Sequence, residues 1–384
     1  MRRKKILFLI RSLEVGGGAE RQLLYLANEL SKSHDVYLIT YYPLHIVNSY
    51  LTLIQDELGL NFTFKVISLN KSGRYDLILF FARYVIQLKK IRPDYVYAFM
   101  NSASVIAILG KLFANNHKII IGNRASNMNL ANYDRLNYLF TGLEKYFSYF
   151  VDLIICNSYA GKDYLQSVGY RQKRINVVQN GINTDYFSPN EDIKNLTIQE
   201  LCIPRDHKVI GIIARHDPMK GIEYFIEAAK LLLKSNNLVT FLIIGSGKAE
   251  YSRELKKLTD HSYCREHFIW LPKQDDILRY HRVLDICTSS SIYGEGFPNV
   301  LAESLSCGNL CVATNVGDSS KILEGVGIIV QPKDSLSICS AWETILKFSS
   351  EKLKESSNLS RERIINNFSI EKMAEHTSQC IQAI

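Results

Sequence analysis

Two glutamates stand close together in the segment 294–303, on either side of an expected helix start, and this arrangement could bind a ligand. Glu295 lies in a loop that glycine and proline keep irregular, whereas Glu303 lies about one turn into a helix expected over residues 299–306. Backbone N–H groups at a helix start, with the positive end of the helix dipole, suit a phosphate, and carboxylates accept hydrogen bonds from sugar hydroxyls. The segment therefore predicts a ligand that carries both a phosphate and a sugar.

The same segment has two other interpretations. Phe297, Val300 and Leu301 are core-type residues at helical spacing, which is typical of an ordinary buried helix with one solvated glutamate. The two glutamates could also form a general acid and a general base. We favour hydroxyl recognition, because a helix start separates the glutamates and because two cations are expected on the other side of the ligand.

These cations are Arg215 and Lys220, which lie around the turn after an expected strand at 209–214. Arginine offers a fork of N–H donors and lysine a compact positive charge, so the pair suits a diphosphate leaving group and could replace a metal ion there. The alternative is that both side chains point into water, as most surface cations do. With a diphosphate between these cations and the glutamates, the predicted ligand is a nucleotide sugar.

Two further loops are rich in small residues. The first expected strand runs into Gly16 and Gly17, where backbone can approach a ligand closely, although the loop lacks the dinucleotide-binding pattern. Gly245 and Ser246 follow another expected strand. A Walker phosphate loop is excluded there, because Leu242 stands where its first glycine would be, and a small-residue loop beneath a nucleotide base remains.

The elements that must position these loops alternate along the chain. Short apolar runs typical of β-strands are separated by stretches of helical periodicity, and the pattern restarts after a polar, turn-forming stretch. Near-continuous apolar strands between helices predict parallel sheets covered on both faces, in two doubly wound α/β domains. The expected strands cover residues 6–10, 36–40, 65–69, 95–99, 118–122, 153–156, 209–214, 239–244, 268–271, 285–287, 310–313 and 328–330.

The chain of 384 residues is too long for one ordinary core. We expect a first Rossmann-like domain over residues 1–175, a linker over 176–189 and a second Rossmann-like domain over 190–367. The terminal segment 368–384 should contain a helix that begins near residue 370. Ligands bind beyond the carboxyl ends of the strands in such sheets, which is where the four loops lie.

Composition and charge exclude several classes of protein. The chain has no apolar run long enough to span a membrane as a helix, and its basic start lacks the cleavage site of a signal peptide. The eight scattered cysteines and nine scattered histidines match neither a disulfide framework nor a dedicated metal site, and they indicate a reduced cytoplasm.

Residues 1–175 carry 23 Lys and Arg against 12 Asp and Glu, which gives this half a net charge of +11. The net charge of the whole chain is +8. No nucleic-acid-binding motif accompanies this charge. The basic half therefore favours a pyrophosphate-bearing substrate or anionic lipid.

The order and spacing of these motifs resemble a retaining glycosyltransferase of family 4. The resemblance covers nearly the whole chain, from the Gly-Gly-Ala-Glu-Arg loop at 17–21, through 180–183, to the segment 368–373. It implies the α/β fold called GT-B, in which two doubly wound Rossmann-like domains face each other across a cleft and the C-terminal helix crosses back to the N-terminal domain. It also implies a transfer that needs no metal or other cofactor and retains the anomeric configuration by same-face attack.

The resemblance implies a role for each candidate residue. Arg215 and Lys220 would bind the donor diphosphate, Glu295 would face hydroxyls of the transferred sugar, and Glu303 would hold the ribose. The catalytic residues would be Glu295, Arg215 and Lys220. The implied donor-binding set is Gly16, Gly17, Arg215, Lys220, Gly245, Ser246, Glu295, Phe297, Pro298, Asn299, Val300 and Glu303.

One departure from the family concerns the loop after the expected strand at 118–122. Many relatives have a histidine there, near the reacting sugar, whereas this chain has Asn123-Arg124-Ala125-Ser126. Arg124 and Asn101 are candidates for contact with the acceptor or the transferred sugar. Arg124 could equally be an ordinary loop residue.

The donor and acceptor are inferred from the resemblance to transferases of lipopolysaccharide, capsule and lipid-linked oligosaccharide synthesis. We expect a UDP-sugar that carries a hexose or N-acetylhexosamine, with GDP-mannose as the alternative, and an acceptor glycan linked to a polyprenyl diphosphate. No nucleic acid is expected as a partner. The protein would be cytoplasmic and peripheral at the inner face of the membrane.

Aromatic and basic residues between Phe80 and Arg92 could give an amphipathic helix that contacts anionic lipid. Alternatively, the aromatic rings pack on the sheet and the cations are solvated.

Two other functions are compatible with the same residues. One is a nucleotide-sugar epimerase or hydrolase of the same fold, and the other is a catalytically silent sugar-nucleotide-binding protein. A silent protein is disfavoured, because Arg215, Lys220, Glu295 and Glu303 are all intact.

Overall fold

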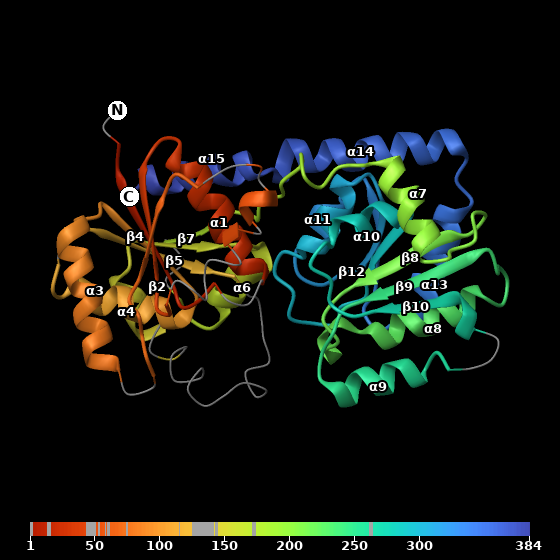
Figure 1. Ribbon diagram of the computed structural model, residues 1–384, viewed down its shortest axis with the longest axis horizontal. Coiled ribbons are helices and arrows are strands. Elements are labelled where there is room, and N and C mark those ends of the chain that lie inside the picture. The colour runs from red at the N-terminus through yellow and green to blue at the C-terminus, as the bar shows by residue number, and fades with distance from the viewer. Residues whose placement is uncertain are drawn as a thin grey trace. The chain divides into compact units, whose positions relative to one another are not determined.

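The computed structural model divides the chain into two compact units (Figure 1). The first contains residues 1–181 and 370–384, and the second contains residues 182–369. The structure describes residues 3–384 except 14–16, 44–50, 53, 58, 60–61, 74–75, 115, 125–141, 143–144, 171–173 and 261–263.

The first unit is built on a seven-stranded parallel sheet in the order β3-β2-β1-β4-β5-β6-β7. The middle residues of its central strands are apolar and buried, because helices cover both faces of the sheet. The order changes direction between β1 and β4. The strands are β1 (Lys5–Ile10), β2 (Asp35–Thr40), β3 (Lys65–Ser68), β4 (Tyr95–Phe99), β5 (Lys118–Asn123), β6 (Leu153–Cys156) and β7 (Ile175–Val177).

Several helices of the first unit pack on this sheet. They are α1 (Gly18–Ser31), α3 (Leu77–Ile91), α4 (Asn101–Lys111), α6 (Tyr159–Ser167) and the C-terminal α15 (Ile370–Gln382), and a short 3-10 turn, η2 (Ser148–Phe150), precedes β6. Helix α15 packs against α1 and contributes Met373 and Ala374 to the core. The expectation that the chain's last helix returns to the first domain is confirmed.

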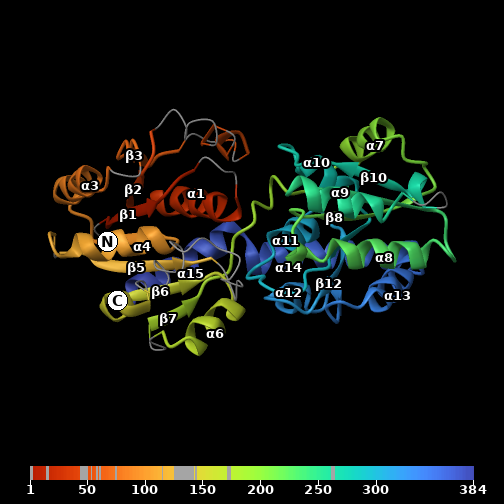
Figure 2. The same cartoon turned by 90° about the horizontal axis from the view of Figure 1, so that it is seen from below.

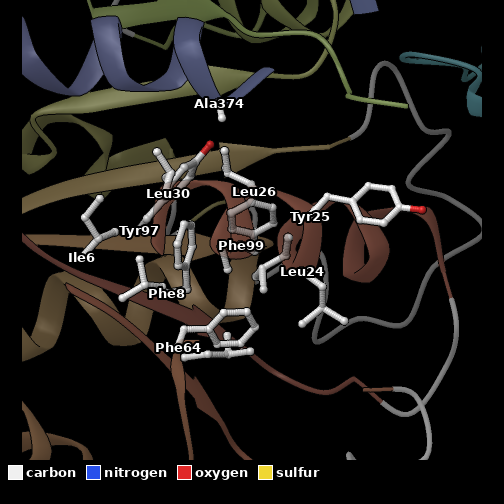
Figure 3. Packing of buried hydrophobic residues seen from close by; sticks show 14 of the residues in the cluster. Ile6, Phe8, Leu24, Tyr25, Leu26, Leu30, Phe64, Tyr97, Phe99 and Ala374 are labelled. Carbon is white, nitrogen blue, oxygen red and sulfur yellow. The ribbon is translucent and has the colours of Figure 1, made fainter. Parts of the chain in front are cut away.

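The core between α1, α15 and the sheet contains a group of aromatic rings that pack in tilted and edge-to-face contacts (Figure 3). Phe8 of β1 lies 5.3 Å from Tyr97 of β4, and Tyr97 lies 4.8 Å from Phe99, measured between ring centroids. Leu24 and Leu30 of α1 belong to the same cluster. These rings fix the carboxyl end of β4, where the chain turns toward α4.

The second unit contains a six-stranded parallel sheet in the order β10-β9-β8-β11-β12-β13. This is the strand order of a doubly wound fold, and it reverses direction between β8 and β11. The prediction of two such sheets is confirmed. The strands are β8 (Lys208–Ile213), β9 (Val239–Ile244), β10 (Phe268–Leu271), β11 (Ile286–Ser289), β12 (Leu310–Thr314) and β13 (Gly327–Val330).

The helices of the second unit lie on both faces of its sheet: in Figure 1, α8 and α9 lie below the sheet, and α11 and α14 lie above it. Phe225 of α8 and Trp342 of α13 are fully buried and form one core cluster, whereas Leu301 of α11 and Ile364 of α14 belong to another. The elements are α7 (Glu191–Glu200), η4 (Pro218–Lys220), α8 (Ile222–Leu232), α9 (Ala249–Lys257), η5 (Arg265–His267), α10 (Leu278–Val283), α11 (Asn299–Ser306), α12 (Ser319–Leu323), α13 (Ser335–Leu346) and α14 (Ser350–Phe368).

Within the part of the chain that the structure describes, no helix is both long enough and apolar enough to cross a membrane.

Candidate active site

The predicted residues of the second unit lie at the carboxyl edge of its sheet. Loops follow the adjacent strands β9, β8, β11 and β12, and the reversal of strand order lies between the second and third of them. In doubly wound sheets the loops diverge at such a reversal and leave a crevice where ligands bind. The loop after β8 contains Arg215 and Lys220, and the loop after β11 contains Glu295.

Lys220 and Glu295 form an ion pair across this reversal. The Lys220 Nζ atom donates to Glu295 Oε1, and the Ser291 hydroxyl donates to the same oxygen at 2.6 Å. Glu295 is only 8% exposed, so its carboxylate is held by short contacts rather than by water. The pair places one positive and one negative group side by side, which suits a ligand that has both a phosphate and hydroxyl groups.

Arg215 is the more exposed of the two predicted cations. Its Nη2 atom donates to Asp217 Oδ2 at 2.8 Å, and 60% of its side chain is exposed. Asp217 also accepts a hydrogen bond from the Met219 N–H at 3.0 Å, which begins the turn η4. The guanidinium is therefore anchored by one contact, and most of the side chain remains exposed.

The loops after β8 and β11 touch through their backbones. Gly221 has φ +57°, and a Cβ atom there would lie 2.3 Å from the Ser290 carbonyl oxygen. The Ser290 hydroxyl donates to the carbonyl oxygens of Lys220 and Gly221 at 3.0 and 2.9 Å. Glycine is required at this position, both for its left-handed backbone and for the close approach.

The start of α11 supplies the backbone that the sequence predicts as a phosphate site. Pro298 precedes the helix and Asn299 begins it, without a side-chain cap. Asn299 and Val300 are half-buried, whereas the Phe297 ring packs on Phe368 at 5.5 Å. The N–H groups at this helix start lie in the same loop as Glu295, so a phosphate and a carboxylate-bound hydroxyl could be neighbours.

Glu303 is buried in α11, with 8% of its surface exposed. Since both glutamates are buried, the interpretation of an ordinary helix with one solvated glutamate is wrong. The Glu303 Oε2 atom lies 3.4 Å from Nε2 of His281, which lies in α10.

Gly245 and Ser246 form a close contact with the loop after β8. The His216 N–H donates to the Ser246 carbonyl at 3.0 Å, and a Cβ atom on Gly245 would lie 1.8 Å from the Ala214 carbonyl oxygen. The Ser246 hydroxyl accepts from the Lys273 N–H at 2.9 Å. These two residues hold neighbouring loops together, and Ser246 itself is exposed.

The sequence-based prediction missed the loop after β12. Gly317 has φ +62° and packs directly on the backbone oxygens of Glu295 and Gly296. The Asp318 N–H donates to the Gly296 carbonyl at 2.9 Å. A glycine that closely follows a buried strand is the signal that could have identified it.

In the first unit, the candidates also lie at the carboxyl edge of the sheet. Gly17 precedes α1, and its carbonyl accepts from the Arg21 N–H at 3.2 Å. Asn101 is the first residue of α4. Gly16 falls outside the described residues. The structure adds Met100, which follows the end of β4 at the reversal of strand order. Its φ of +74° is rare for a residue with a side chain.

Arg124 follows β5 and is fixed against the end of the sheet. Its guanidinium lies 4.4 Å from the centroid of the Phe99 ring, and its Nη1 atom donates to Asn180 Oδ1 at 3.0 Å. Burial lowers the pKa of Arg124, although the nearby Tyr97 phenol opposes the effect. Arg124 is therefore a positioned cation rather than a freely solvated loop residue.

The predicted membrane helix is partly wrong. Phe80 and Tyr84 of α3 are buried and pack toward the sheet, with the Phe80 ring 4.6 Å from the Tyr41 ring. The exposed apolar residues of α3 are instead Leu77, Ile78, Leu79 and Ile86.

A cavity of about 310 Å³ in the second unit is separate from these loops. It is lined by the first residues of β8, β11 and β12, which are Lys208, Ile286 and Leu310. It therefore lies at the amino edge of the sheet, opposite the candidate site.

Two family models match the chain, one in each unit. Residues 16–186 match the family described as Glycosyltransferase Family 4, and residues 207–347 match the family described as Glycosyl transferases group 1.

Curated relatives match parts of the chain at low identity. UDP-Gal:alpha-D-GlcNAc-diphosphoundecaprenol alpha-1,3-galactosyltransferase from Escherichia coli is 26% identical over 52% of this chain, and the match spans about half of that enzyme (51%). N-acetylgalactosamine-N,N'-diacetylbacillosaminyl-diphospho-undecaprenol 4-alpha-N-acetylgalactosaminyltransferase from Campylobacter jejuni is 23% identical over 86% of this chain and 87% of its own length.

Among solved structures, Anabaena Alr3699/HepE in complex with UDP-glucose matches with a TM-score of 0.83 and 20% identity over 100% of both chains. A sucrose-phosphate synthase from Thermosynechococcus elongatus matches with a TM-score of 0.76 and 17% identity over 99% of both chains. These likenesses show that the fold is that of GT-B glycosyltransferases.

Proposed function

The chain belongs to the family 4 glycosyltransferases, and on that premise we propose that it transfers a hexose or N-acetylhexosamine from a nucleotide sugar to a lipid-linked glycan. The observation that carries the proposal is the Lys220–Glu295 pair at the reversal of strand order in the second sheet. A cation and a buried carboxylate stand there beside a helix start, which is the set of groups that a sugar diphosphate requires.

The chemistry follows from the charges that develop when the bond between the anomeric carbon and the diphosphate breaks. Negative charge grows on the leaving diphosphate, and the sugar gains positive, oxocarbenium-like character. Lys220 and Arg215, with the N–H groups at the start of α11, would stabilise the leaving group without a metal ion. Glu295 would accept hydrogen bonds from the sugar hydroxyls and fix the sugar relative to the bond that breaks.

We further propose that the donor is a UDP-sugar and that the reaction retains the anomeric configuration. Two observations on similar proteins support this choice. The Escherichia coli relative is named for UDP-Gal, and Alr3699/HepE was crystallised with UDP-glucose. Both named relatives form an α linkage. If the donor sugar is α-linked to its diphosphate, an α product means that the configuration is retained.

The acceptor proposed here is a glycan carried on a polyprenyl diphosphate. Both relatives named above act on sugars attached to diphosphoundecaprenol. The basic first half of the chain supports this choice, because a diphosphate linker is strongly anionic. Arg124 is a candidate for that contact, since the sheet edge already holds its guanidinium in place.

A thermal-shift screen tests the donor assignment. A ligand that binds only the folded state raises the unfolding temperature, and at equal concentration a tighter-binding ligand raises it more. UDP and UDP-sugars should stabilise the protein more than GDP, GDP-mannose and ADP-glucose, and Lys220→Met should abolish the shift. A larger shift with GDP-mannose would reassign the base, and no shift with any nucleotide would contradict the proposal.

The exposed face of α3 leads us to add a membrane contact to this proposal. Ile78 is 84% exposed, and Ile86 lies on the same side of the helix two turns later. Leu112 and Phe113, at the end of α4, extend the apolar surface, because the Phe113 ring lies 5.6 Å from Phe81 of α3. Figures 1 and 2 both show the two helices side by side.

Cations border this apolar surface, which favours an anionic lipid surface over a neutral protein partner. Lys89 and Lys90 are in the last turn of α3, Arg92 follows it, and Lys111 ends α4. Apolar side chains flanked by lysine and arginine suit the boundary between head groups and acyl chains. A contact of this kind would bring the protein to an acceptor that is itself embedded in the membrane.

Vesicle flotation tests the membrane contact. The Ile78→Ser/Ile86→Ser protein should lose binding to vesicles that contain anionic lipid, whereas Leu336→Ser should retain it. Leu336 is a matched control, since it is 68% exposed but lies on α13 in the second unit. Equal binding by all three proteins, or no binding by the unaltered protein at low salt, would contradict this part of the proposal.

A same-fold epimerase or hydrolase is the second candidate function. It would use the same diphosphate and hydroxyl contacts but would need no acceptor. Release of UDP that does not depend on added lipid-linked glycan would favour it.

A further inference from the structure

We infer that His281 is a positioning residue, which holds the Glu303 carboxylate in the orientation needed to bind the ribose of the donor. This inference rests on the proposed function, which gives Glu303 its role as a ribose contact. His281 lies in α10, outside the loops that carry the predicted site residues. Its imidazole is fully buried, and its Nε2 atom lies 3.4 Å from Glu303 Oε2.

A buried network fixes the plane of the His281 ring. Its Nδ1 atom lies 3.2 Å from the Ser304 hydroxyl, and its backbone carbonyl accepts from Asn309 Nδ2 at 2.6 Å. The same Asn309 nitrogen also donates to the Ser304 hydroxyl at 3.0 Å. The Phe187 ring packs edge-on against the imidazole with 5.6 Å between centroids.

The contacts of Ser304 and Asn309 are compatible with a His281 tautomer that carries its hydrogen on Nε2. An amide nitrogen can only donate, so the Ser304 oxygen accepts from Asn309 and keeps its own proton for another acceptor. If that proton goes to Nδ1 of His281, the ring carries its hydrogen on Nε2, the nitrogen beside Glu303. His281 can then donate from Nε2 to the carboxylate. In a neutral histidine, the hydrogen bond made by one ring nitrogen decides whether the other nitrogen carries the hydrogen.

A neutral donor at this position would have a specific effect on Glu303. A buried carboxylate needs hydrogen-bond donors, because it has lost most of its water. A lysine or arginine beside it would neutralise its charge and compete with the ribose. An imidazole N–H instead supports one carboxylate oxygen and leaves lone pairs for the ribose hydroxyls, which also donate. The distance of 3.4 Å is long for a hydrogen bond, and we expect it to shorten when the ribose orders the carboxylate.

The test compares UDP with 2′,3′-dideoxy-UDP, which lacks the ribose hydroxyls. Binding of each nucleotide is measured by calorimetry, and the ratio of the two dissociation constants is the ribose discrimination. We expect a ratio on the order of tenfold or more in the unaltered protein, which is the effect of hydrogen bonds to a charged group. Glu303→Ala should bring the ratio close to one.

Three variants then isolate His281. His281→Leu should also bring the ratio close to one, and adding it to Glu303→Ala should cause no further loss, because both changes remove the same contact. His281→Gln should restore much of the ratio, since its side-chain amide can place a donor near the position of Nε2. His267→Leu is the matched control, because its ring bonds the Val239 carbonyl at the amino end of β9, and it should leave the ratio unchanged.

The outcomes separate this inference from the proposed function. A ratio that stays at its normal value in His281→Leu, while Glu303→Ala abolishes it, would overturn the inference and leave the function intact. Failure of the unaltered protein to bind either UDP or GDP would overturn the proposed function and the inference with it. If His281→Leu does not fold, Ser304→Ala provides the same test, because it removes the hydroxyl that contacts Nδ1 of the His281 ring.

Discussion

Replacing Gly221 with alanine should destabilise the second unit more than the same replacement at Gly325. Both glycines have a left-handed backbone, with φ +57° and φ +78°. A residue with a Cβ atom loses about 1–2 kcal/mol of stability in this conformation. An added Cβ meets nothing within 4 Å at Gly325, whereas at Gly221 it lies 2.3 Å from the Ser290 carbonyl oxygen.

The close contact sets the expected difference. Overpacking of this kind costs about 1–3 kcal/mol, because backbone must move to relieve it. Gly221→Ala should therefore lower the free energy of unfolding by about 2–5 kcal/mol, and Gly325→Ala by only about 1–2 kcal/mol. The moving backbone carries Lys220 and the Ser290 hydroxyl bonded to it, so only Gly221→Ala should also weaken nucleotide binding.

Urea unfolding followed by tryptophan fluorescence is a suitable assay. Trp270 and Trp342 are the two tryptophans of the chain, and both belong to the second unit, so the signal reports that unit. The midpoint and slope of the transition give the free energy. Equal destabilisation by the two variants would mean that the close contact between the loops after β8 and β11 adds nothing to the cost, contrary to the prediction.

Three further predictions concern chemistry and pH. Glu295→Gln should lower turnover by about tenfold or more with little change in nucleotide affinity. Glu303→Gln should chiefly raise the dissociation constant of the nucleotide, by about tenfold. Equal, small effects of the two variants would place both glutamates outside the site. EDTA should leave turnover unchanged, and strong stimulation by added Mg²⁺ would contradict the assignment of the leaving-group charge to Arg215 and Lys220. Burial, helped by a neighbouring lysine, lowers the pKa of His117 to about 4. In the unfolded chain this histidine binds a proton near the ordinary pKa of about 6.5, whereas in the folded protein it binds one only near pH 4. As the pH falls from 7 to 5, protonation therefore favours the unfolded chain and should lower the free energy of unfolding by about 2 kcal/mol. Thermal unfolding of His117→Gln should show a weaker loss over the same range, and an identical loss would contradict the assignment.

Most of the fold could be predicted from the sequence, because parallel strands buried on both faces are nearly continuous apolar runs. The predicted strand at 239–244 has the bounds of β9, and that at 95–99 has the bounds of β4. β7 was missed because it has only three residues and one of them is exposed. α14 was missed because its 19 residues are largely polar, with only three of them buried.

The candidate site was less accessible to sequence reasoning, because its residues meet through tertiary contacts. Loop positions after strands identified Lys220 and Glu295 separately, and nothing in the sequence indicated that these residues, 75 positions apart, form an ion pair. His281 lies on a short helix between Tyr280 and Arg282, and nothing in that stretch of sequence marks it as a site residue. Its neighbour Glu303 becomes evident only when α10 and α11 are placed side by side.

The most direct test of the central claim is transfer of sugar to a lipid-linked acceptor. The purified protein is incubated with UDP-sugars that carry a labelled hexose or N-acetylhexosamine, with and without a polyprenyl-diphosphate-linked glycan, and the lipid product is analysed by mass spectrometry. We expect the lipid to gain the mass of one sugar, UDP to be released in equal amount, and Lys220→Met to abolish both. Release of UDP, or isomerisation of the sugar, that is the same without the acceptor would contradict this claim.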